Sequence, residues 1–393
     1  MQRRSLSLIL VAVVAVSGCV PTRAQRRYTR SEANKTLSKL ERVGLVIGEF
    51  PIDGANAVID GDTIRVKGLD SSMRLLGIDT EETFKKPFER EAFARGWEQY
   101  KKEMKGDATR PVKMATPLGE DAKHWAQAFF EGVTTVRLER DHPGEIRDYY
   151  GRYLAYVFAK KNGEWVNYNI ECVRAGMAPY FTKYGRSRRF DKEFREAQAQ
   201  AMAQKIGIWD PNRLHYDDYE ERLRWWNGRA DVIARFEKEA EDNPNYITLT
   251  RWNALLQLEQ HLGEEVVVLG AVNEIKLGDR GPTVVKLGRS RGHDFDVVFF
   301  DKDVALASGV LMAKGEYVRI RGTVHKYVNR YDHTEKLQLQ VTLPGQVLAT
   351  SPELDRLLTE DTGTSGTEIT ATPDSDGTVS SFSTPPPLED DEE

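Results

Sequence analysis

Two strand-rich blocks constrain the fold of this 393-residue chain more than any other feature. In each block, apolar and polar residues alternate over short runs, and glycine or aspartate turns separate the runs, which is typical of β-strands. Helical patterns follow or interrupt the strands, and a charged helical stretch separates the two blocks. Strands grouped with helices that pack on them favour the α+β class. We therefore predict two small β-barrels, the first of them with packed helices.

The first block covers residues 48–212. Its strand-like runs lie at 56–66, 73–79, 134–140 and 152–160. Its helical patterns lie at 120–132, 166–177 and 190–209. Of the two cysteines in the chain, Cys172 lies in the second of these helices, where we expect it to be buried as a small apolar residue.

The second block covers residues 246–350. It follows a charged segment at 213–245, which we predict to be a helical connector that packs Trp225 or Trp226 on a neighbouring element. Its strand-like runs lie at 264–275, 282–288, 295–300, 315–328 and 336–343. A short helical stretch separates the third strand from the fourth, and this order predicts a five-stranded barrel like the OB-fold.

The N-terminal end has the features of an export signal. Residues 1–18 combine a basic start, an apolar run too short to span a bilayer, and small residues before Cys19, which resembles a bacterial lipoprotein signal. We expect Cys19 to be lipidated and to anchor the protein to a membrane of the cell envelope, on its periplasmic or extracellular face. An ordinary secretory signal cut near Ala24 is the alternative. With Cys19 as the first residue of the mature protein, we predict that residues 19–47 form a tether with a short helix.

The C-terminal end, residues 351–393, carries twelve acidic residues and one basic residue, and it is rich in serine, threonine, glycine and proline. Such a composition buries too little apolar surface to fold, so we predict a disordered acidic tail. With a net charge of −5 for the whole chain and −11 for this tail, residues 1–350 carry +6. The body is therefore mildly basic, which permits a polyanionic partner.

One stretch of the first block concentrates charge at the end of an apolar run. The sequence RLLGIDTEET begins at Arg74 and includes Asp79 and Glu82. Asp62 stands earlier, directly after a tight Asp-Gly turn, and Arg152 opens a later strand. In this order and spacing, the three motifs resemble the staphylococcal nuclease (thermonuclease-like) family over most of the first block.

This resemblance implies a fold, a reaction and a cofactor. The fold is an OB-like five-stranded barrel with packed helices. The reaction is hydrolysis of phosphodiester bonds in DNA, with RNA as an open alternative, by attack of water that leaves 3′-phosphates. The implied cofactor is Ca²⁺, held by Asp62, Asp79 and the main-chain carbonyl of Thr80, which are the hard oxygen ligands that this ion prefers.

The same resemblance implies roles for five further side chains. Glu82 would act as, or orient, the general base for the attacking water. Arg74 and Arg152 would bind the phosphate, because a guanidinium donates two hydrogen bonds at once and stays charged when desolvated. Tyr150 and Tyr184 match positions that contact the nucleotide, where an aromatic ring can stack on a base.

The chain departs from the family pattern in two places. Glu81 stands where the family usually has proline, and the sequence leaves open whether it loosens Glu82 or offers the metal another ligand. Residues 83–117 form a much longer segment than the family's loop, with nine basic and five acidic residues between positions 85 and 113. Apolar side chains recur there at helical spacing, at Phe93, Trp97, Tyr100 and Met104. We predict an extra helix packed beside the barrel, or a basic lid that clamps nucleic acid.

The second block offers a possible single-strand groove of its own. Its candidate residues are Arg280, Arg289, Arg291, Lys326 and Arg330, with Tyr327 and Tyr331 between them. The chain contains no Gly-x-Ser-x-Gly motif, Walker loop or dinucleotide fingerprint that would indicate another reaction. We therefore predict an envelope-anchored, Ca²⁺-dependent nuclease, with a non-catalytic adaptor that binds nucleic acid or protein as the alternative. The sequence indicates no obligate protein partner.

Overall fold

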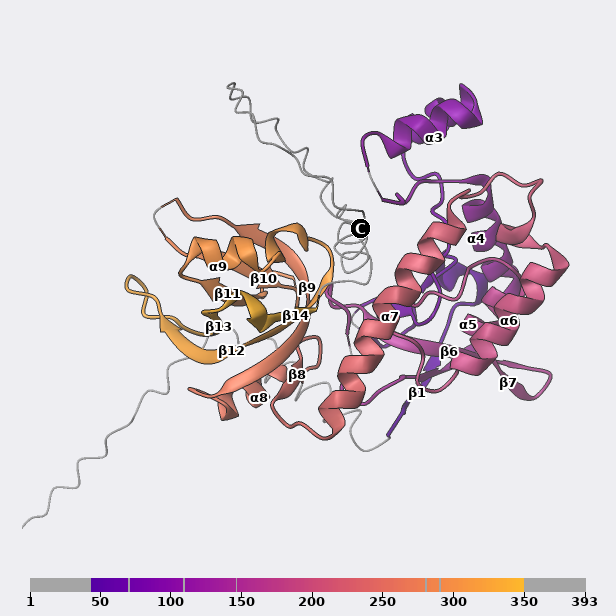
Figure 1. Cartoon of the computed structure of the whole chain (residues 1–393). Helices are drawn as coiled ribbons and strands as arrows, with labels where there is room; N and C mark the ends of the chain where they lie inside the picture. The colour runs from indigo at the N-terminus through magenta and orange to yellow at the C-terminus, as the bar shows by residue number, and fades with distance from the viewer. Residues whose placement is uncertain are drawn as a thin grey trace, which may run out of the picture.

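The computed structural model describes residues 44–349, except positions 70, 109, 146, 280 and 290. The predicted signal segment, Cys19, nearly all of the tether and the acidic tail lie outside these residues. Within them, the helices are too short or too polar for any to cross a bilayer. Two β-sheets lie on either side of a long helix, α7, as Figure 1 shows.

The first sheet forms the barrel predicted for the first block. Its strands are β1 (Val46–Pro51), β2 (Val58–Asp60), β3 (Thr63–Ile64), β4 (Met73–Leu75), β5 (Thr135–Glu139), β6 (Tyr153–Lys161) and β7 (Glu164–Asn167). They are ordered β1-β5-β6-β4-β3-β2, with β4 and β6 parallel and β7 beside β6. The Lys67 amide donates to the Pro51 carbonyl at 2.9 Å, which brings the far end of the sheet back to β1.

Three helices cover this barrel. They are α4 (Pro117–Phe130), α5 (Tyr168–Arg174) and α6 (Asp191–Gln204). The start of α4 is specified locally, because the Thr116 hydroxyl accepts from the Gly119 amide at 3.0 Å and proline occupies the first helical position. Cys172 is fully buried in α5, as predicted.

The long segment after Glu82 forms two helices where the sequence predicted one. They are α2 (Pro87–Ala94) and α3 (Trp97–Lys105), and Gly96 between them has a φ of 123°, a conformation that favours glycine and ends the first helix. The prediction of a single helix was therefore wrong. Its four apolar side chains nevertheless share one cluster, in which the ring of Phe93 lies 6.1 Å from that of Trp97 and 5.8 Å from that of Tyr100.

Helix α7 (Tyr219–Glu241) joins the two barrels. Near its start, the Trp226 ring meets Phe181 of the first barrel edge-on at 4.7 Å, so Trp226 is the connector tryptophan that packs on a neighbour. Its second half buries Val232, Ile233 and Phe236 against strands of the second barrel. The helix therefore packs on both barrels (Figure 1).

The second sheet contains the five-stranded barrel predicted from the second block. Its strands are β9 (Glu265–Lys276), β10 (Thr283–Leu287), β11 (Phe295–Phe299), β12 (Tyr317–Val328) and β13 (Glu335–Val341). They close in the order β9-β10-β11-β13-β12-β9, and the predicted short helix is α9 (Lys302–Ala307). Three short elements were not predicted: β8 (Tyr246–Thr248), α8 (Ala254–Gln260) and β14 (Val347–Ala349).

The packing of α7 on the first barrel can be tested at Trp226. We expect Trp226→Ala to lower the free energy of unfolding by about 3–5 kcal/mol, because a large ring that is 3% exposed leaves a cavity when it is removed. Chemical denaturation followed by far-ultraviolet circular dichroism measures the change. Met202→Ala on α6 is the control, since that side chain is 46% exposed and should change stability by less than about 0.5 kcal/mol. Equal effects of the two substitutions would contradict the proposed packing.

Candidate active site

Three of the predicted site residues meet at one edge of the first barrel. Asp62 follows the turn between β2 and β3, Arg74 lies in β4, and Asp79 follows that strand. Nη2 of Arg74 donates to Oδ1 of Asp79 at 2.5 Å, and Nη1 of the same guanidinium donates to Oδ2 of Asp62. One arginine therefore holds the two carboxylates together, with only 8% of Asp62 and 7% of Asp79 exposed.

The ionisation of this trio follows from its geometry. Burial raises the pKa of Asp79, but Lys113 and Arg74 outweigh burial and hold that pKa well below its ordinary value. Burial lowers the pKa of Arg74, but Asp62 and Asp79 together raise it above its ordinary value. Arg74 and Asp79 are thus both charged at neutral pH.

Glu82 is joined to the same cluster by two lysines that sequence reasoning did not assign to the site. Nζ of Lys113 lies 2.9 Å from Oδ1 of Asp79 and 3.5 Å from Oε1 of Glu82. Nζ of Lys85 lies 3.3 Å from Oε2 of Glu82 and 3.3 Å from Oδ2 of Asp60. The two lysines come from opposite ends of the long segment, so only its folding could reveal them.

Asp60, the aspartate of the Asp-Gly turn before Asp62, also belongs to the cluster. It is 5% exposed, and its Oδ1 accepts from the Gly61 amide at 2.9 Å. Burial, with the charges of Asp62 and Glu82, raises the pKa of Asp60 to about 6. Asp60 therefore adds a further carboxylate beside Lys85.

The backbone around Thr80 and Glu82 is tightly packed. A Cβ at Gly61 would lie 2.7 Å from Cγ2 of Thr80, and one at Gly119 would lie 2.0 Å from the carbonyl oxygen of Glu82. The Thr116 amide also donates to that carbonyl at 3.0 Å. Glycines at these two positions let the β2–β3 turn and the start of α4 approach the site closely.

Glu81 points away from this cluster into a buried polar pocket. Its Oε1 accepts from the Tyr216 amide at 2.8 Å and the Tyr219 hydroxyl at 2.7 Å, and its Oε2 accepts from the Thr116 hydroxyl. Burial raises the pKa of Glu81, although these hydrogen bonds favour its charged form. Both oxygens are thus engaged, and Glu81 ties the start of the connector to the first barrel.

Arg152 shares the face of Arg74 but has a different partner. The pairing of Arg74 with Leu154 in the parallel β4–β6 register puts Arg152, two residues before Leu154, on the same side of the sheet. Its Nε donates to Oδ2 of Asp148 at 2.8 Å, and its guanidinium lies 5.6 Å from the Tyr150 ring.

The two predicted substrate tyrosines are both exposed, Tyr150 by 42% and Tyr184 by 63%. Tyr184 lies near the trio through Phe181, whose ring is 5.7 Å from the Tyr184 ring and 5.5 Å from the Arg74 guanidinium. Both rings are therefore partly exposed to solvent.

The donor set fits a hard divalent cation. Among the described residues, no group of three or more His, Cys, Asp and Glu side chains is close enough to hold a metal. Calcium, however, also takes main-chain carbonyls and waters as ligands. Asp62 and Asp79 contact one guanidinium, so their oxygens converge, and the carbonyl of Thr80, next to Asp79, could add a third protein oxygen.

The second barrel contacts the loop that carries Arg152. The Arg291 amide donates to the Tyr149 carbonyl at 2.8 Å, and Nδ2 of Asn273 donates to the Tyr149 hydroxyl at 2.9 Å. Arg289, which the sequence assigned to a single-strand groove, is only 5% exposed. That assignment was wrong because the loop that carries Arg289 packs against the first barrel.

The other predicted groove residues have mixed outcomes. Arg280 lies outside the described residues, whereas Tyr327 and Tyr331 are exposed by 42% and 95%. Nζ of Lys326 lies 3.2 Å from Oε2 of Glu335. Arg291 and Arg330 are exposed.

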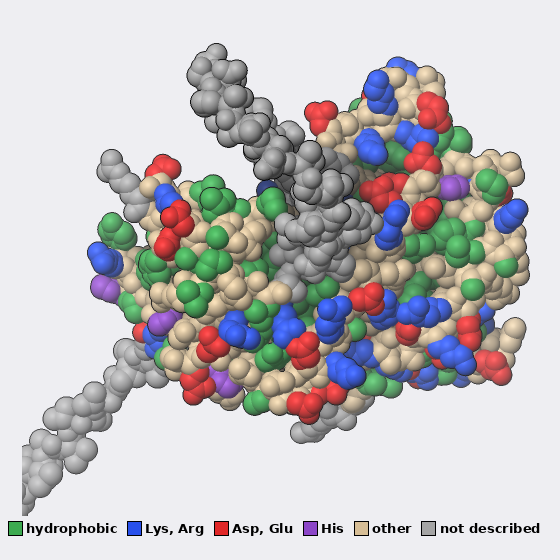
Figure 2. Space-filling model, in the orientation of Figure 1, with side chains coloured by type: hydrophobic (Ala, Val, Ile, Leu, Met, Phe, Trp, Pro, Cys, Tyr) green, Lys and Arg blue, Asp and Glu red, His purple; other side chains and the backbone are tan. Residues whose placement is uncertain are grey.

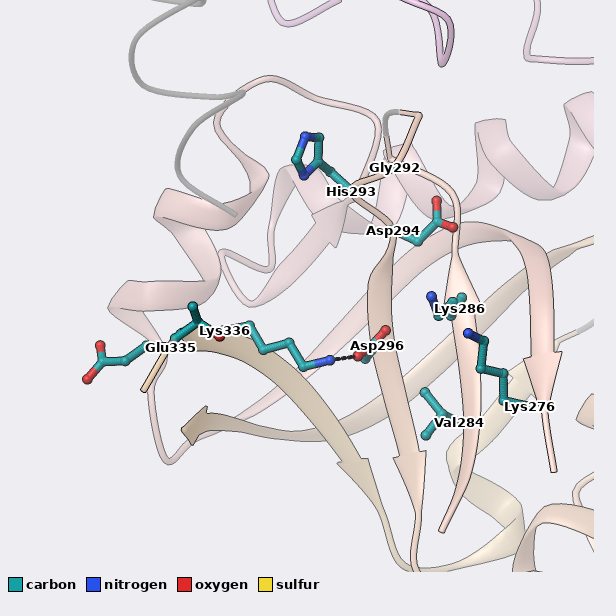
Figure 3. Close-up of a pocket in the computed structure, with 10 residues that line it drawn as sticks. Lys276, Val284, Lys286, Gly292, His293, Asp294, Asp296, Glu335 and Lys336 are labelled. Carbon is teal, nitrogen blue, oxygen red and sulfur yellow. Dashed lines mark hydrogen bonds and ion pairs between the residues drawn. The ribbon is translucent and has the colours of Figure 1, made fainter. Parts of the chain in front are cut away.

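A cavity of about 470 Å³ lies on the second barrel (Figure 3). Lys276 and Lys286 point into it from neighbouring strands, and each lies 3.4 Å from a carboxylate oxygen of Glu274. Lys336 pairs with Asp296 at its other side (Figure 3). Acids balance the lysines, so this cavity does not have the one-signed charge of a phosphate groove.

The barrel and its cluster of acids and arginines define a protein of the nuclease-barrel class. Residues 72–211 match the model of the family described as staphylococcal nuclease homologue. The chain is 30% identical over 155 residues to a thermonuclease of Staphylococcus hyicus, covering 39% of this chain and 72% of that protein. It therefore belongs to the staphylococcal nuclease homologue family.

Two further relatives extend the comparison. An uncharacterized protein of Methanocaldococcus jannaschii is 30% identical over 155 residues, which cover 39% of this chain and 69% of that protein. A prophage-derived endonuclease of Bacillus subtilis is 29% identical over 156 residues, and the chain spans only 42% of its length. The family and the names of these relatives support a nuclease.

The contact between the second barrel and the Arg152 loop can be tested at Tyr149. We expect Tyr149→Phe to lower kcat for nuclease activity by about three- to tenfold, because loss of the bond to Asn273 loosens the loop that positions Arg152. Steady-state kinetics give kcat and KM separately.

Tyr246→Phe is the matched control for this substitution. It removes a hydroxyl that accepts from Arg319 at 3.0 Å, away from the Arg152 loop. Its kcat should equal that of the wild type. If both variants lose the same activity, the loop contact has no special role.

Proposed function

We propose that the protein is a Ca²⁺-dependent nuclease that hydrolyses phosphodiester bonds of DNA, and of RNA as a second substrate, at the outer edge of the first barrel. The observation that carries this proposal is the bridge formed by Arg74 between Asp62 and Asp79, with Glu82 joined to Asp79 through Lys113. A surface salt bridge would need no such convergence of buried acids and bases.

Asp62, Asp79 and the carbonyl of Thr80 are the residues that would hold the calcium ion. When bound, the ion supplies positive charge beside the phosphate and a site for coordinated water. Arg74 then exchanges a carboxylate partner for phosphate oxygens, and its fork of donors suits two of them at once. Arg152, on the same face of the sheet, donates to the phosphate from the other side, which neutralises charge that develops in the transition state.

Glu82 accepts a proton from the attacking water. The water oxygen forms the new bond to phosphorus as the bond to the 5′-oxygen breaks. The 5′-oxygen takes up a proton from solvent water and leaves as a hydroxyl, and the 3′-phosphate remains on the other fragment. Lys85 and Lys113 hold the Glu82 carboxylate in place through ion pairs. Tyr150 and Tyr184 offer exposed rings to the neighbouring bases.

The role of Glu82 is tested by substitution. We expect Glu82→Gln to lower kcat on single- and double-stranded DNA by about 10²–10⁴-fold, because the amide cannot accept the proton. A chelator should abolish wild-type activity, and added Ca²⁺ should restore it. Glu164→Gln is the control, since that exposed glutamate of β7 lies outside the cluster. Undiminished activity of Glu82→Gln would exclude Glu82 as the base, and wild type without any cleavage would favour the adaptor.

Envelope anchoring is a separate part of the proposal and rests on the sequence around Cys19 alone. When the full chain is expressed in a bacterium, we expect the wild type in the membrane fraction, because a lipidated cysteine partitions into the bilayer. Cys19→Ser should move the protein to the soluble fraction, or leave it with an uncleaved signal. Immunoblots of separated fractions give the answer, and equal membrane association of both forms would contradict lipidation.

A further inference from the structure

Three basic side chains surround the indole ring of Trp225 where the two barrels approach each other. Cζ of Arg110 lies 5.0 Å from the ring centre, Nζ of Lys183 lies 4.8 Å from it, and Cζ of Arg229 lies 5.4 Å from it. These four residues are called the interbarrel patch. Arg110 belongs to the long segment after α3, Lys183 to the first barrel, and Trp225 and Arg229 to α7.

The interbarrel patch has more positive than negative charge. A single carboxylate, Glu316, pairs with both arginines, and it lies 3.7 Å from Nη1 of Arg229. Arg229 is only 1% exposed, so it holds Trp225 in place, and Arg110 and Lys183 present the accessible positive charge. The nearby acids Asp231 and Glu237 pair instead with Arg186 and Arg188. On the face shown in Figure 2, positive and negative side chains are mixed.

Lys183 has an unusual position within this patch. Among the described residues, no carboxylate lies within ion-pair distance of its ammonium group, which lies instead over the rings of Trp225 and Tyr184. Burial lowers the pKa of Lys183, and the charges of Arg229 and Lys113 lower it further. Such an ammonium group gains most from an external anion.

A row of contacts leads from the patch to the catalytic cluster. The Lys183 ammonium lies 5.8 Å from the Tyr184 ring, which meets Phe181 edge-on at 5.7 Å. Phe181 in turn lies 5.5 Å from the Arg74 guanidinium. Tyr184 is 63% exposed, so its ring can meet a base between the two groups of cations.

We propose that the interbarrel patch binds the sugar–phosphate backbone of a single nucleic-acid strand whose scissile phosphate lies at Arg74, with Lys183 contacting a phosphate beyond Tyr184. This inference rests on the proposed function. If the patch binds in this way, the protein prefers, as substrates, strands long enough to reach from the catalytic cluster to the patch. A single strand suits the site because exposed rings stack on unpaired bases while basic groups follow the backbone.

The patch is a feature of this chain rather than of the family match alone. Trp225 and Arg229 lie beyond the matched residues 72–211, and Arg110 lies in the long segment that departs from the family pattern. The second barrel contributes Glu316, which fixes both arginines. The long segment, α7 and the second barrel therefore create one anion-binding surface together.

The proposal is tested by binding of a fluorescently labelled 20-nucleotide single-stranded DNA to the full chain in the presence of a chelator. We expect Lys183→Met to weaken binding about fivefold near 0.1 M salt and to lower the slope of log Kd against log salt by about 0.7, the loss of one phosphate contact. Lys183→Arg should retain the affinity of the wild type, because the charge is kept. Lys192→Met on α6 is the control, since that lysine pairs with Glu196 outside the patch.

Kinetics with Ca²⁺ add a second measurement. Lys183→Met should raise KM for the 20-nucleotide strand by a similar factor with kcat unchanged, and should leave hydrolysis of a dinucleotide unaffected. Unchanged binding of Lys183→Met, or equal losses on both substrates, would overturn the proposal. If the wild type binds the strand through Lys183 but cleaves nothing, the patch stands and the nuclease function fails.

Discussion

The bridge between Arg74 and the carboxylates of Asp62 and Asp79 is the interaction on which the site depends. Two acids that are 8% and 7% exposed would repel each other and lose hydration without a cation between them. The guanidinium stays charged in that setting because both carboxylates raise its pKa. The bridge therefore offsets the repulsion and lost hydration of the two carboxylates. The same charged groups are the ones that a metal and a phosphate would contact in the proposed function. The same bridge keeps the two carboxylates converged at one edge of the barrel.

Adjacent glutamates perform opposite tasks beside this bridge. Successive side chains of an extended segment point to opposite sides, so Glu82 faces the cluster while Glu81 faces the interior. There the Tyr216 amide, the Tyr219 hydroxyl and the Thr116 hydroxyl all donate to Glu81. Removing one of these donors leaves a buried carboxylate oxygen without a hydrogen bond, which costs about 1–3 kcal/mol. The family usually has proline at this position, and proline restricts φ. In this chain the hydrogen bonds to Glu81 fix the backbone from which Glu82 projects.

Much of this fold could be predicted because its signals are local. Most strands of both barrels lie in short apolar runs bounded by glycine or aspartate turns, and the order of the second set around α9 specified a closed barrel. Strands β8 and β14 are three residues long, too short to show a period. The break at Gly96 was missed because apolar spacing continued across it. In the site, family motifs indicated Asp62, Arg74, Asp79 and Glu82, but Lys85 and Lys113 could not be found. They reach the cluster through tertiary folding of a segment that has no counterpart in the family pattern.

The second barrel contacts the first at two places. Each contact joins a residue that precedes α7 in the sequence to a residue that follows it. Asn273 and Arg291 of the second barrel hold Tyr149, which lies three residues before Arg152. Glu316 of the second barrel holds Arg110, which lies three residues before Lys113. The two contacts therefore lie close in the sequence to Arg152 and to Lys113, respectively. An independent binding module on a flexible tether would touch neither. Because α7 buries Trp226 against the first barrel and Phe236 against the second, the two barrels cannot separate without exposing one of these two side chains. The second barrel is thus part of the structure that positions the site, and loss of its docking should disturb Arg152 and Lys113 before it unfolds either barrel.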